Sequence, residues 1–191
     1  MCGIIAYIGN REAKSILIEG LKRLEYRGYD SAGIALVEPS GELQRARSVG
    51  RVLGLEELVA DGFNGSLGIA HTRWATHGIP NEENAHPHAT ERVVIVHNGI
   101  IENFQELKDE VMAAGAVLAS ETDTEVVAHL ITAYLDGGDS PRQATAKSLK
   151  RLCGAFSLGI LFAGEEDLMI AARRGSPLAI GFGEGEMFLG S

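Results

Sequence analysis

Cys2 stands second in the sequence, directly after the initiator Met1. Removal of Met1, which a small second residue permits, would leave a cysteine that carries its own free α-amine. Such an amine titrates near ~7.7–8, against ~10.4 for a lysine, so a usable base would lie within one residue of the thiol. The arrangement predicts a nucleophile with its own base. The alternative is that Cys2 is a small apolar residue at the start of a strand.

A second polar segment, residues 71–78 with the sequence HTRWATHG, directly follows an apolar run. Within it, Arg73 offers a planar fork of donors that suits a carboxylate. Histidines here and in residues 84–88 are possible metal ligands, but no acidic partner or thiol accompanies them at the spacing of a zinc site. These histidines are His71, His77, His86 and His88. We expect no metal centre and interpret 84–88 as a rigid loop with hydrogen-bonded histidines.

Two further segments could bind a substrate or stabilise a reaction intermediate. An apolar strand over 93–96 is expected to end at Asn98 and Gly99, a pair that ordinarily forms a hairpin turn. Because a capped helix follows, the Asn amide and the Gly N–H would instead be suitable donors for a developing oxyanion. Asp123 lies in an acidic stretch, 120–125, at the expected start of a helix. It could bind a substrate ammonium, or simply favour the positive end of the helix dipole.

Helices are predicted where apolar residues recur every three to four positions behind a capping residue. Capping residues with Glu or Gln three positions later stand at Asn103, Thr122 and Ser140. The last of these also has proline at the first helical position. The predicted helices cover residues 12–26 and three segments that begin at these caps and end before Gly115, Gly137 and Gly154.

Short apolar runs predict strands. They cover residues 4–8, 33–37, 67–71, 93–97, 156–162, 168–172 and 178–182. The last three follow one another with short turns, which favours antiparallel pairing among them. Neighbouring strands and a block of consecutive helices favour an α+β layered sandwich over a doubly wound parallel sheet. Continuous apolar strands indicate sheets that are covered on both faces, and we expect Cys153 to lie in the core.

Composition excludes several classes of protein. The chain has 191 residues, 45% hydrophobic, with a net charge of −9, which does not suit binding to nucleic acid or anionic lipid. No apolar run approaches the ~20 residues of a membrane span, and the N-terminus lacks the basic region of a signal peptide. Two cysteines cannot form a disulfide framework. We expect a single cytoplasmic domain, residues 1–191, with no nucleic-acid or membrane partner.

Taken in order, these segments resemble the class II glutamine amidotransferases, the group with an N-terminal nucleophile (Ntn). The resemblance covers nearly the whole chain, from Cys2 to about Gly190. Within the group, five motifs are most similar to the glutaminase domains of glucosamine-6-phosphate synthases. These motifs are YRGYDSAG at 26–33, HTRWATHG at 71–78, HNGIIEN at 97–103, SETDTE at 120–125 and GSPL at 175–178. Glutamine phosphoribosylpyrophosphate amidotransferases fit the motifs at 26–33 and 71–78 less well.

The resemblance implies a four-layer αββα sandwich, the Ntn-hydrolase fold, with Cys2 at the end of an inner strand. It also implies hydrolysis of L-glutamine to glutamate and ammonia through a γ-glutamyl thioester. Cys2 would be the nucleophile and its freed α-amine the general base and acid. Asn98 and the N–H of Gly99 would stabilise the oxyanion, and Arg27 and Gly28 would lie near the nucleophile.

The substrate-binding residues also follow from the resemblance. Arg73 would pair with the α-carboxylate of glutamine, supported by Thr76 and His77, and Asp123 would receive the α-ammonium. Trp74 would gate the path of ammonia.

The family synthases continue into sugar-isomerase domains that bind fructose 6-phosphate, whereas this sequence stops at Ser191. The resemblance therefore implies a homodimeric full-length enzyme, with a domain that hydrolyses glutamine without a cofactor but cannot build the sugar alone. Two alternatives stay open. One is the glutaminase domain of a sibling amidotransferase, such as glutamine phosphoribosylpyrophosphate amidotransferase. The other is a non-catalytic glutamine-binding module that keeps Met1.

Overall fold

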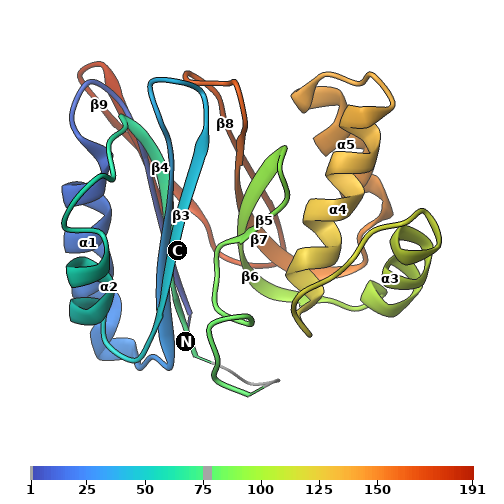
Figure 1. The fold of residues 1–191 in the computed structure, drawn as a ribbon, viewed down its shortest axis with the longest axis horizontal. Coiled ribbons are helices and arrows are strands. Elements are labelled where there is room, and N and C mark those ends of the chain that lie inside the picture. The colour runs from blue at the N-terminus through green and yellow to red at the C-terminus, as the bar shows by residue number, and fades with distance from the viewer. Residues whose placement is uncertain (1, 75–78) are drawn as a thin grey trace.

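The computed structural model describes residues 2–74 and 79–191. Two antiparallel sheets lie face to face, and helices cover the outer side of each, so the layers run helix, sheet, sheet, helix (Figure 1). The expected four-layer αββα sandwich is confirmed. Within the described ranges, no helix combines the length and the apolar character that crossing a bilayer requires.

The first sheet has six strands in the order β3-β2-β4-β1-β10-β9. Their bounds are β1 Gly3–Ile8, β2 Ser31–Val37, β3 Leu43–Val49, β4 Leu67–Arg73, β9 Ala179–Gly183 and β10 Glu186–Gly190. The helices on its outer face are α1, Ala13–Leu24, and α2, Val52–Leu58, and a short 3-10 turn, Glu25–Arg27, follows α1. The central strands β2 and β4 are buried along their whole length, as expected for strands covered on both faces.

The second sheet has four strands in the order β5-β6-β7-β8. Their bounds are β5 His88–Ala89, β6 Val93–Ile101, β7 Gly154–Phe162 and β8 Met169–Arg174. Three helices lie on its outer side, namely α3, Phe104–Ala113, α4, Asp123–Asp136, and α5, Pro141–Arg151 (Figure 1). The long strand β6 pairs with β7 from Val93 to Ile101, so it does not end at the Asn-Gly pair as the sequence suggested.

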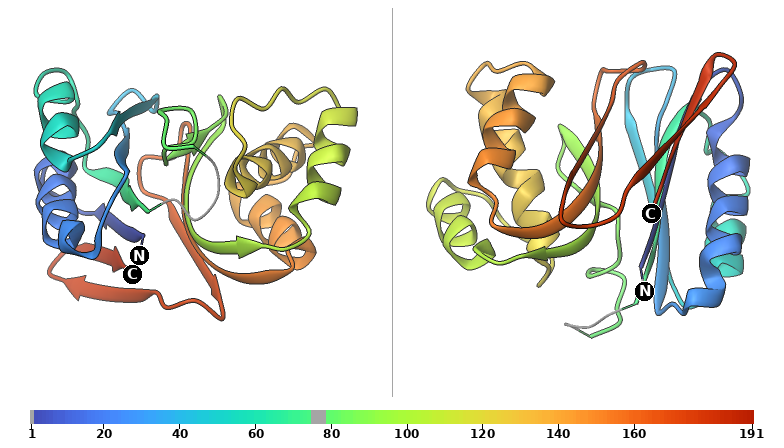
Figure 2. Two further views of the ribbon diagram at one scale, coloured as in Figure 1. Left: turned by 90° about the horizontal axis from the view of Figure 1, so that it is seen from below. Right: turned by 180° about the vertical axis from the view of Figure 1, so that it is seen from behind.

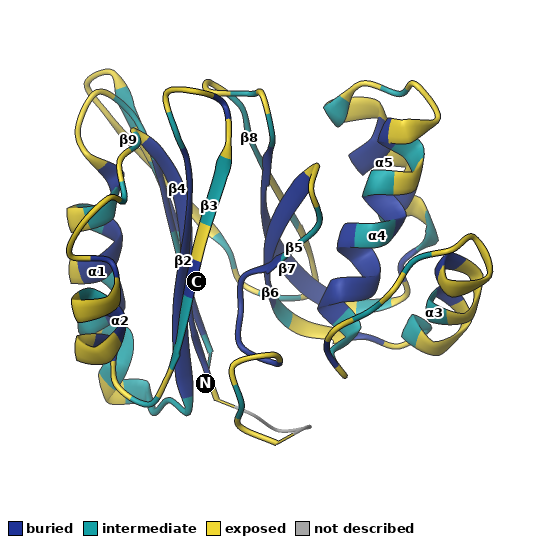
Figure 3. Cartoon of the chain, in the orientation of Figure 1, coloured by how far each residue is buried: buried dark blue, intermediate teal, exposed yellow. Residues whose placement is uncertain are grey.

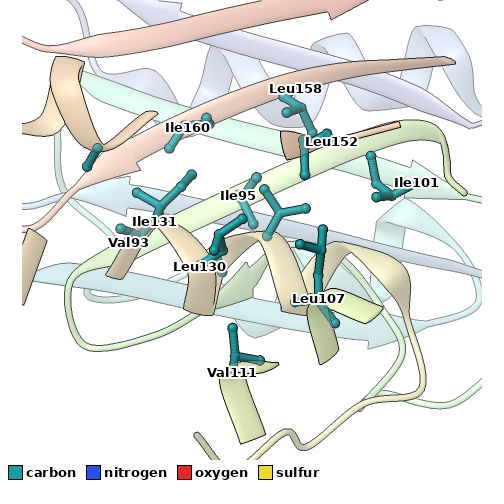
Figure 4. Packing of buried hydrophobic residues seen from close by; sticks show 14 of the residues in the cluster. Val93, Ile95, Ile101, Leu107, Val111, Leu130, Ile131, Leu152, Leu158 and Ile160 are labelled. Atoms are coloured by element: carbon teal, nitrogen blue, oxygen red, sulfur yellow. The ribbon is translucent and has the colours of Figure 1, made fainter. Parts of the chain in front are cut away.

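Much of the two sheets and of the helix faces turned toward them is buried (Figure 3). Buried hydrophobic residues form clusters between the sheets and beneath each helical layer. Ile69, Val96 and Leu161 belong to the core between the sheets. On the outer side of the second sheet, Leu130 and Ile131 of α4 pack with residues of β6 (Figure 4). Each fully buried Leu or Ile contributes about 1.5–3 kcal/mol of stability, so these cores hold the strands that carry the polar residues described below.

Local capping signals located the starts of α3, α4 and α5, and two of the three predicted caps form side-chain hydrogen bonds. The Thr122 side chain accepts a hydrogen bond from the N–H of Glu125, and Ser140 forms a complete capping box. At Asn103 the helix begins as predicted, but the side chain forms no capping hydrogen bond. Its amide instead donates to the Arg151 carbonyl and accepts from the N–H of Cys153, which ties α3 to the start of β7.

Other predictions were wrong where distant pairing decides the structure. β9 does not pair with β8 but joins β10 in the first sheet. The sequence pattern also missed β3, β5, β10 and α2, because these elements are short or expose one face and lack a continuous apolar run. Cys153 is exposed, not buried.

Candidate active site

Cys2 lies beside the end of β4, because β1 pairs with β4 from Gly3 opposite Thr72. The N–H of Trp74 donates to Cys2 Sγ at 3.3 Å, and Sγ lies 3.6 Å from the Trp74 carbonyl. The end of the chain is also near, since the N–H of Ser191 donates to the Ile4 carbonyl at 3.1 Å (Figure 2). The half-buried thiol therefore lies where the central strands of the first sheet end.

The thiol opens into a pocket of about 230 Å³ between the two sheets and the start of α4. This volume lies somewhat below the roughly 300–1,000 Å³ of pockets for drug-sized ligands, so it suits a smaller molecule. The pocket is lined by Cys2, Arg73, Trp74, His86, His97, Asn98, Gly99, Ile100, Phe104, Glu121, Thr122, Asp123 and Thr124. It thus brings together Cys2, Arg73, Asn98 and Asp123, which the sequence singled out separately.

Asn98 of β6 reaches across to the first sheet. Its Nδ2 lies 3.4 Å from the Cys2 carbonyl and donates to Ser191 Oγ at 2.6 Å. Its Oδ1 lies 2.8 Å from Nε2 of His71, and that same nitrogen lies 3.1 Å from the His97 carbonyl. Both ends of the amide are thus engaged, and its nitrogen end lies on the side of Cys2.

Gly99 occupies a position that no other residue fits. Its φ is +125°, and an added Cβ would lie 2.1 Å from the Ala155 carbonyl oxygen of β7. Glycine is needed where φ is positive and another backbone approaches closely. The approach of β7 therefore explains the Asn-Gly pair inside a strand, next to the pocket.

Arg73 and Asp123 place opposite charges on the wall of one pocket. Arg73 is only 6% exposed, and its NH1 lies 3.8 Å from Asp30 Oδ1. Asp123 begins α4, and its Oδ2 accepts the N–H of Ile101 at 2.8 Å. Burial acts to raise the pKa of Asp123, but contacts with His97 and a hydrogen bond from the Ile101 N–H bring that pKa below its ordinary value. A buried guanidinium and an ionised carboxylate together suit a zwitterionic ligand.

Trp74 covers the pocket from the end of β4 and is half exposed. Gly28, with φ at +92°, packs so closely beneath the indole that an added Cβ would lie 1.4 Å from Cζ3. Arg27 stacks its guanidinium 5.9 Å from the ring centre of Tyr26 and donates to the Ser191 carbonyl at 3.0 Å. Arg27 and Gly28 thus contact Ser191 and Trp74, and neither is among the residues that line the pocket. The expected roles of Thr76 and His77 fall outside the described residues.

The histidines between the sheets are hydrogen-bonded. Nε2 of His86 contacts the Thr124 hydroxyl at 3.0 Å, and Nε2 of His88 contacts the Thr122 hydroxyl at 3.0 Å. Burial lowers the pKa of His71 to about 4 and lowers those of His86 and His88 well below the ordinary value. Within residues 2–74 and 79–191, no three His, Cys, Asp or Glu side chains are grouped as metal ligands.

Sequence reasoning missed several of the pocket's components. Thr124 and Phe104 line the pocket, and Ser191 holds the Asn98 amide. Thr124 directly follows Asp123 in the acidic segment at the start of α4, and this position could have identified it as a pocket residue. The side chain of Ser191 could not be assigned from sequence, because its role depends on the pairing of β10 with β1.

Comparison with known proteins shows the family of this chain. The profile of the family described as "Glutamine amidotransferase domain" matches residues 71–191. The chain is 56% identical to a protein of Mesorhizobium japonicum and 58% identical to one of Bartonella henselae, both named glutamine--fructose-6-phosphate aminotransferase [isomerizing]. Each match covers 100% of this chain and 32% of the relative, so the chain spans about a third of the length of these curated relatives.

Two solved structures share the fold of this chain. Glutamine phosphoribosylpyrophosphate amidotransferase from B. subtilis has a TM-score of 0.84 at 29% identity, over 99% of this chain and 41% of that one. A structure titled as the allosteric regulatory enzyme of purine biosynthesis has a TM-score of 0.87, also at 29% identity, over 100% of this chain and 42% of that one. By its profile match, its relatives and its Ntn-hydrolase fold, the chain belongs to the glutamine amidotransferases.

Proposed function

We propose that the domain hydrolyses L-glutamine to L-glutamate and ammonia with Cys2 as the nucleophile. One observation carries this proposal. The Cys2 thiol opens into the same small pocket as a buried arginine, an ionised aspartate and an Asn-Gly pair. These are the groups needed to bind an α-amino acid by its carboxylate and ammonium and to stabilise an oxyanion beside the thiol.

The proposed reaction has two halves. With Met1 removed, the α-amine of Cys2 takes the thiol proton while Sγ forms a bond to the side-chain amide carbon of glutamine. The oxyanion accepts hydrogen bonds from Asn98 Nδ2 and the N–H of Gly99. The C–N bond then breaks, ammonia leaves with the proton from the α-ammonium, and a γ-glutamyl thioester remains. Water, deprotonated by the same amine, adds to the thioester and releases glutamate and the free thiol.

The substrate would be oriented by charge. In this proposal Arg73 binds the α-carboxylate with support from Thr76 and His77, and Asp123 binds the α-ammonium. Asp123 is suited to this because its lowered pKa keeps it ionised at neutral pH. Trp74, half exposed above Gly28, would control the exit of ammonia.

In the full-length enzyme we propose that the ammonia is used to convert fructose 6-phosphate to glucosamine 6-phosphate. The supporting observation is the identity of 56–58% to proteins whose name describes that reaction, against 29% to phosphoribosylpyrophosphate amidotransferase. Further domains that bind the sugar would then be this domain's partners, and we expect a cytoplasmic homodimer.

The first test is release of glutamate from L-glutamine by protein whose intact mass shows that Met1 is gone. Cys2→Ala should lower turnover by at least about 10³-fold while glutamine still binds. Cys153→Ser, which removes the other, exposed thiol, is the matched control and should leave turnover unchanged. Undiminished turnover in Cys2→Ala would refute the proposal. An intact mass that shows Met1 retained in the native protein, with glutamine binding but no turnover, would favour the non-catalytic module instead.

A further inference from the structure

An oxyanion site built on an asparagine works only if the amide nitrogen, not the oxygen, faces the substrate. The two ends of the Asn98 side chain differ little in size, so shape alone does not fix its orientation. In this protein the oxygen end lies 2.8 Å from His71 Nε2, and the nitrogen end lies toward Cys2 and Ser191. The orientation therefore depends on what His71 presents to Oδ1.

His71 must carry its proton on Nε2. That nitrogen lies 3.1 Å from the His97 carbonyl oxygen, which can only accept. The same N–H then donates to Oδ1 of Asn98, and the amide nitrogen is left to face the pocket. A neutral imidazole with hydrogen on Nε2 has an acceptor at Nδ1, and His71 is fully buried, so Nδ1 requires a donor.

A series of hydrogen bonds between buried side chains supplies this donor and fixes which atom donates at each step. Nδ1 of His86 lies 3.2 Å from both ring nitrogens of His71. Because Nε2 of His71 carries hydrogen, only its Nδ1 can accept, and His86 Nδ1 donates to it. Nε2 of His86 then accepts the Thr124 hydroxyl at 3.0 Å, a nearer acceptor than Oδ1 of Asp123 at 3.3 Å. The Thr124 oxygen in turn accepts from His97 Nδ1 at 2.9 Å. In this series of hydrogen bonds, each group donates to the next one along the path from His97 to Asn98.

We propose that His71 is a positioning residue for the proposed hydrolysis. Its Nε2–H holds the Asn98 amide with its nitrogen toward the pocket, and His86 and Thr124 fix the tautomer of His71. This inference rests on the proposed function for its effect on rate, but the tautomers themselves do not depend on that function.

This series of hydrogen bonds requires neutral histidines, because a doubly protonated His71 would place its Nδ1–H against the N–H of His86. Burial lowers the pKa of His71 to about 4, although the hydrogen bonds to Asn98 and to the His97 carbonyl act to raise it. Burial and the neighbouring His71 also lower the pKa of His86. Both rings therefore stay neutral at pH 7, as this arrangement of hydrogens needs.

The kinetic test compares two substitutions at one position. His71→Leu removes the donor, and kcat for glutamine hydrolysis should fall by about 10²-fold, with KM changed by less than about threefold. His71→Gln returns an N–H near the position of Nε2 and should recover most of that loss. His88→Leu is the matched control, because His88 is also buried and its ring packs edge-on against His86, but its hydrogen bond goes to the Thr122 hydroxyl. Its kcat should stay within about threefold of the native value.

Imidazole nitrogen NMR of the ligand-free protein gives the second test. Long-range proton–nitrogen spectra should show His71 with hydrogen on Nε2 and His86 and His97 with hydrogen on Nδ1. Hydrogen on Nδ1 of His71 would overturn the inference, as would an unchanged kcat in His71→Leu or an equal loss of kcat in His88→Leu. A native chain that releases no glutamate would overturn the proposed function instead, and the NMR result would still decide the orientation of the amide.

Discussion

The free energy of unfolding should fall steeply between pH 7.5 and pH 5, because three histidines are buried in the neutral form. Burial lowers the pKa of His71 from 6.5 to about 4, and it lowers those of His86 and His88 in the same direction. In the unfolded chain all three return to about 6.5. Between those values the unfolded state binds more protons, so stability is fully present above about pH 6.5 and is lost as the pH falls toward 4.

The magnitude for His71 follows from its pKa of about 4 in the folded state. At pH 5 the unfolded imidazole is almost fully charged and the folded one is mostly neutral, which costs roughly 2 kcal/mol relative to pH 7.5. His71 is fully buried, so solvent does not screen this difference. Asp123 acts outside this window, because its lowered pKa reduces stability only as the pH falls below about 4.

Urea unfolding followed by circular dichroism at pH 7.5, 6 and 5 measures the change. The urea dependence of the free energy should stay constant, which shows that the same surface is exposed at each pH. Proton uptake on unfolding at pH 5.5 is the direct measurement and should approach about 0.9 proton for each buried histidine. His88→Leu should lower this uptake by close to one proton. Stability that changes by less than about 0.5 kcal/mol over this range would show that the histidines are charged or hydrated in the folded state.

Three further substitutions test particular contacts. Gly28→Ala should displace the indole of Trp74 and shift its fluorescence, because the added Cβ would lie 1.4 Å from the ring. Gly50→Ala is the control: its φ is a similar +95° but its Cβ would lie in open space, so it should cost only ~1–2 kcal/mol of backbone strain. Trp74 is the chain's one tryptophan, so an unshifted Gly28→Ala spectrum would contradict this packing. Ser140→Ala should lower the free energy of urea unfolding by ~1 kcal/mol through loss of the helix cap, and no change would mean that the cap contributes nothing. Arg73→Lys should raise KM for glutamine by roughly tenfold or more because it loses the two-pronged donor, and an unchanged KM would remove Arg73 from the carboxylate role.

Local signals in the sequence located much of the site. The cap at Ser140 and the apolar runs that became β4 and β6 depend on neighbours within a few residues, so a single chain segment carries the information. The sequence also singled out Cys2, Arg73, Asn98 and Asp123 as chemically competent. It could not show that they share a pocket, because they lie on four segments that only the packing of two sheets brings together.

Contacts between distant segments decided the features that local patterns misjudged. Asn-Gly usually turns a chain, but β6 runs straight through Asn98 and Gly99 because β7 pairs along its whole length. Asn103 stands at the N-cap position of α3 as predicted, yet its amide bonds to backbone groups at the end of α5 and just before β7 instead of capping the helix. In each case the residue has more than one satisfactory local arrangement, and pairing with a remote strand or helix end selects one of them.

The sequence by itself determined which side chains can do chemistry, since nucleophilicity, charge and hydrogen-bonding capacity belong to residue types. Tertiary structure alone decided how those groups are protonated and oriented. The pKa of His71 and the direction of the Asn98 amide arise from burial between two sheets and from partners 26 and 27 positions away. Desolvation and hydrogen-bond geometry are properties of the packed interior, and they do not exist until the two sheets have come together.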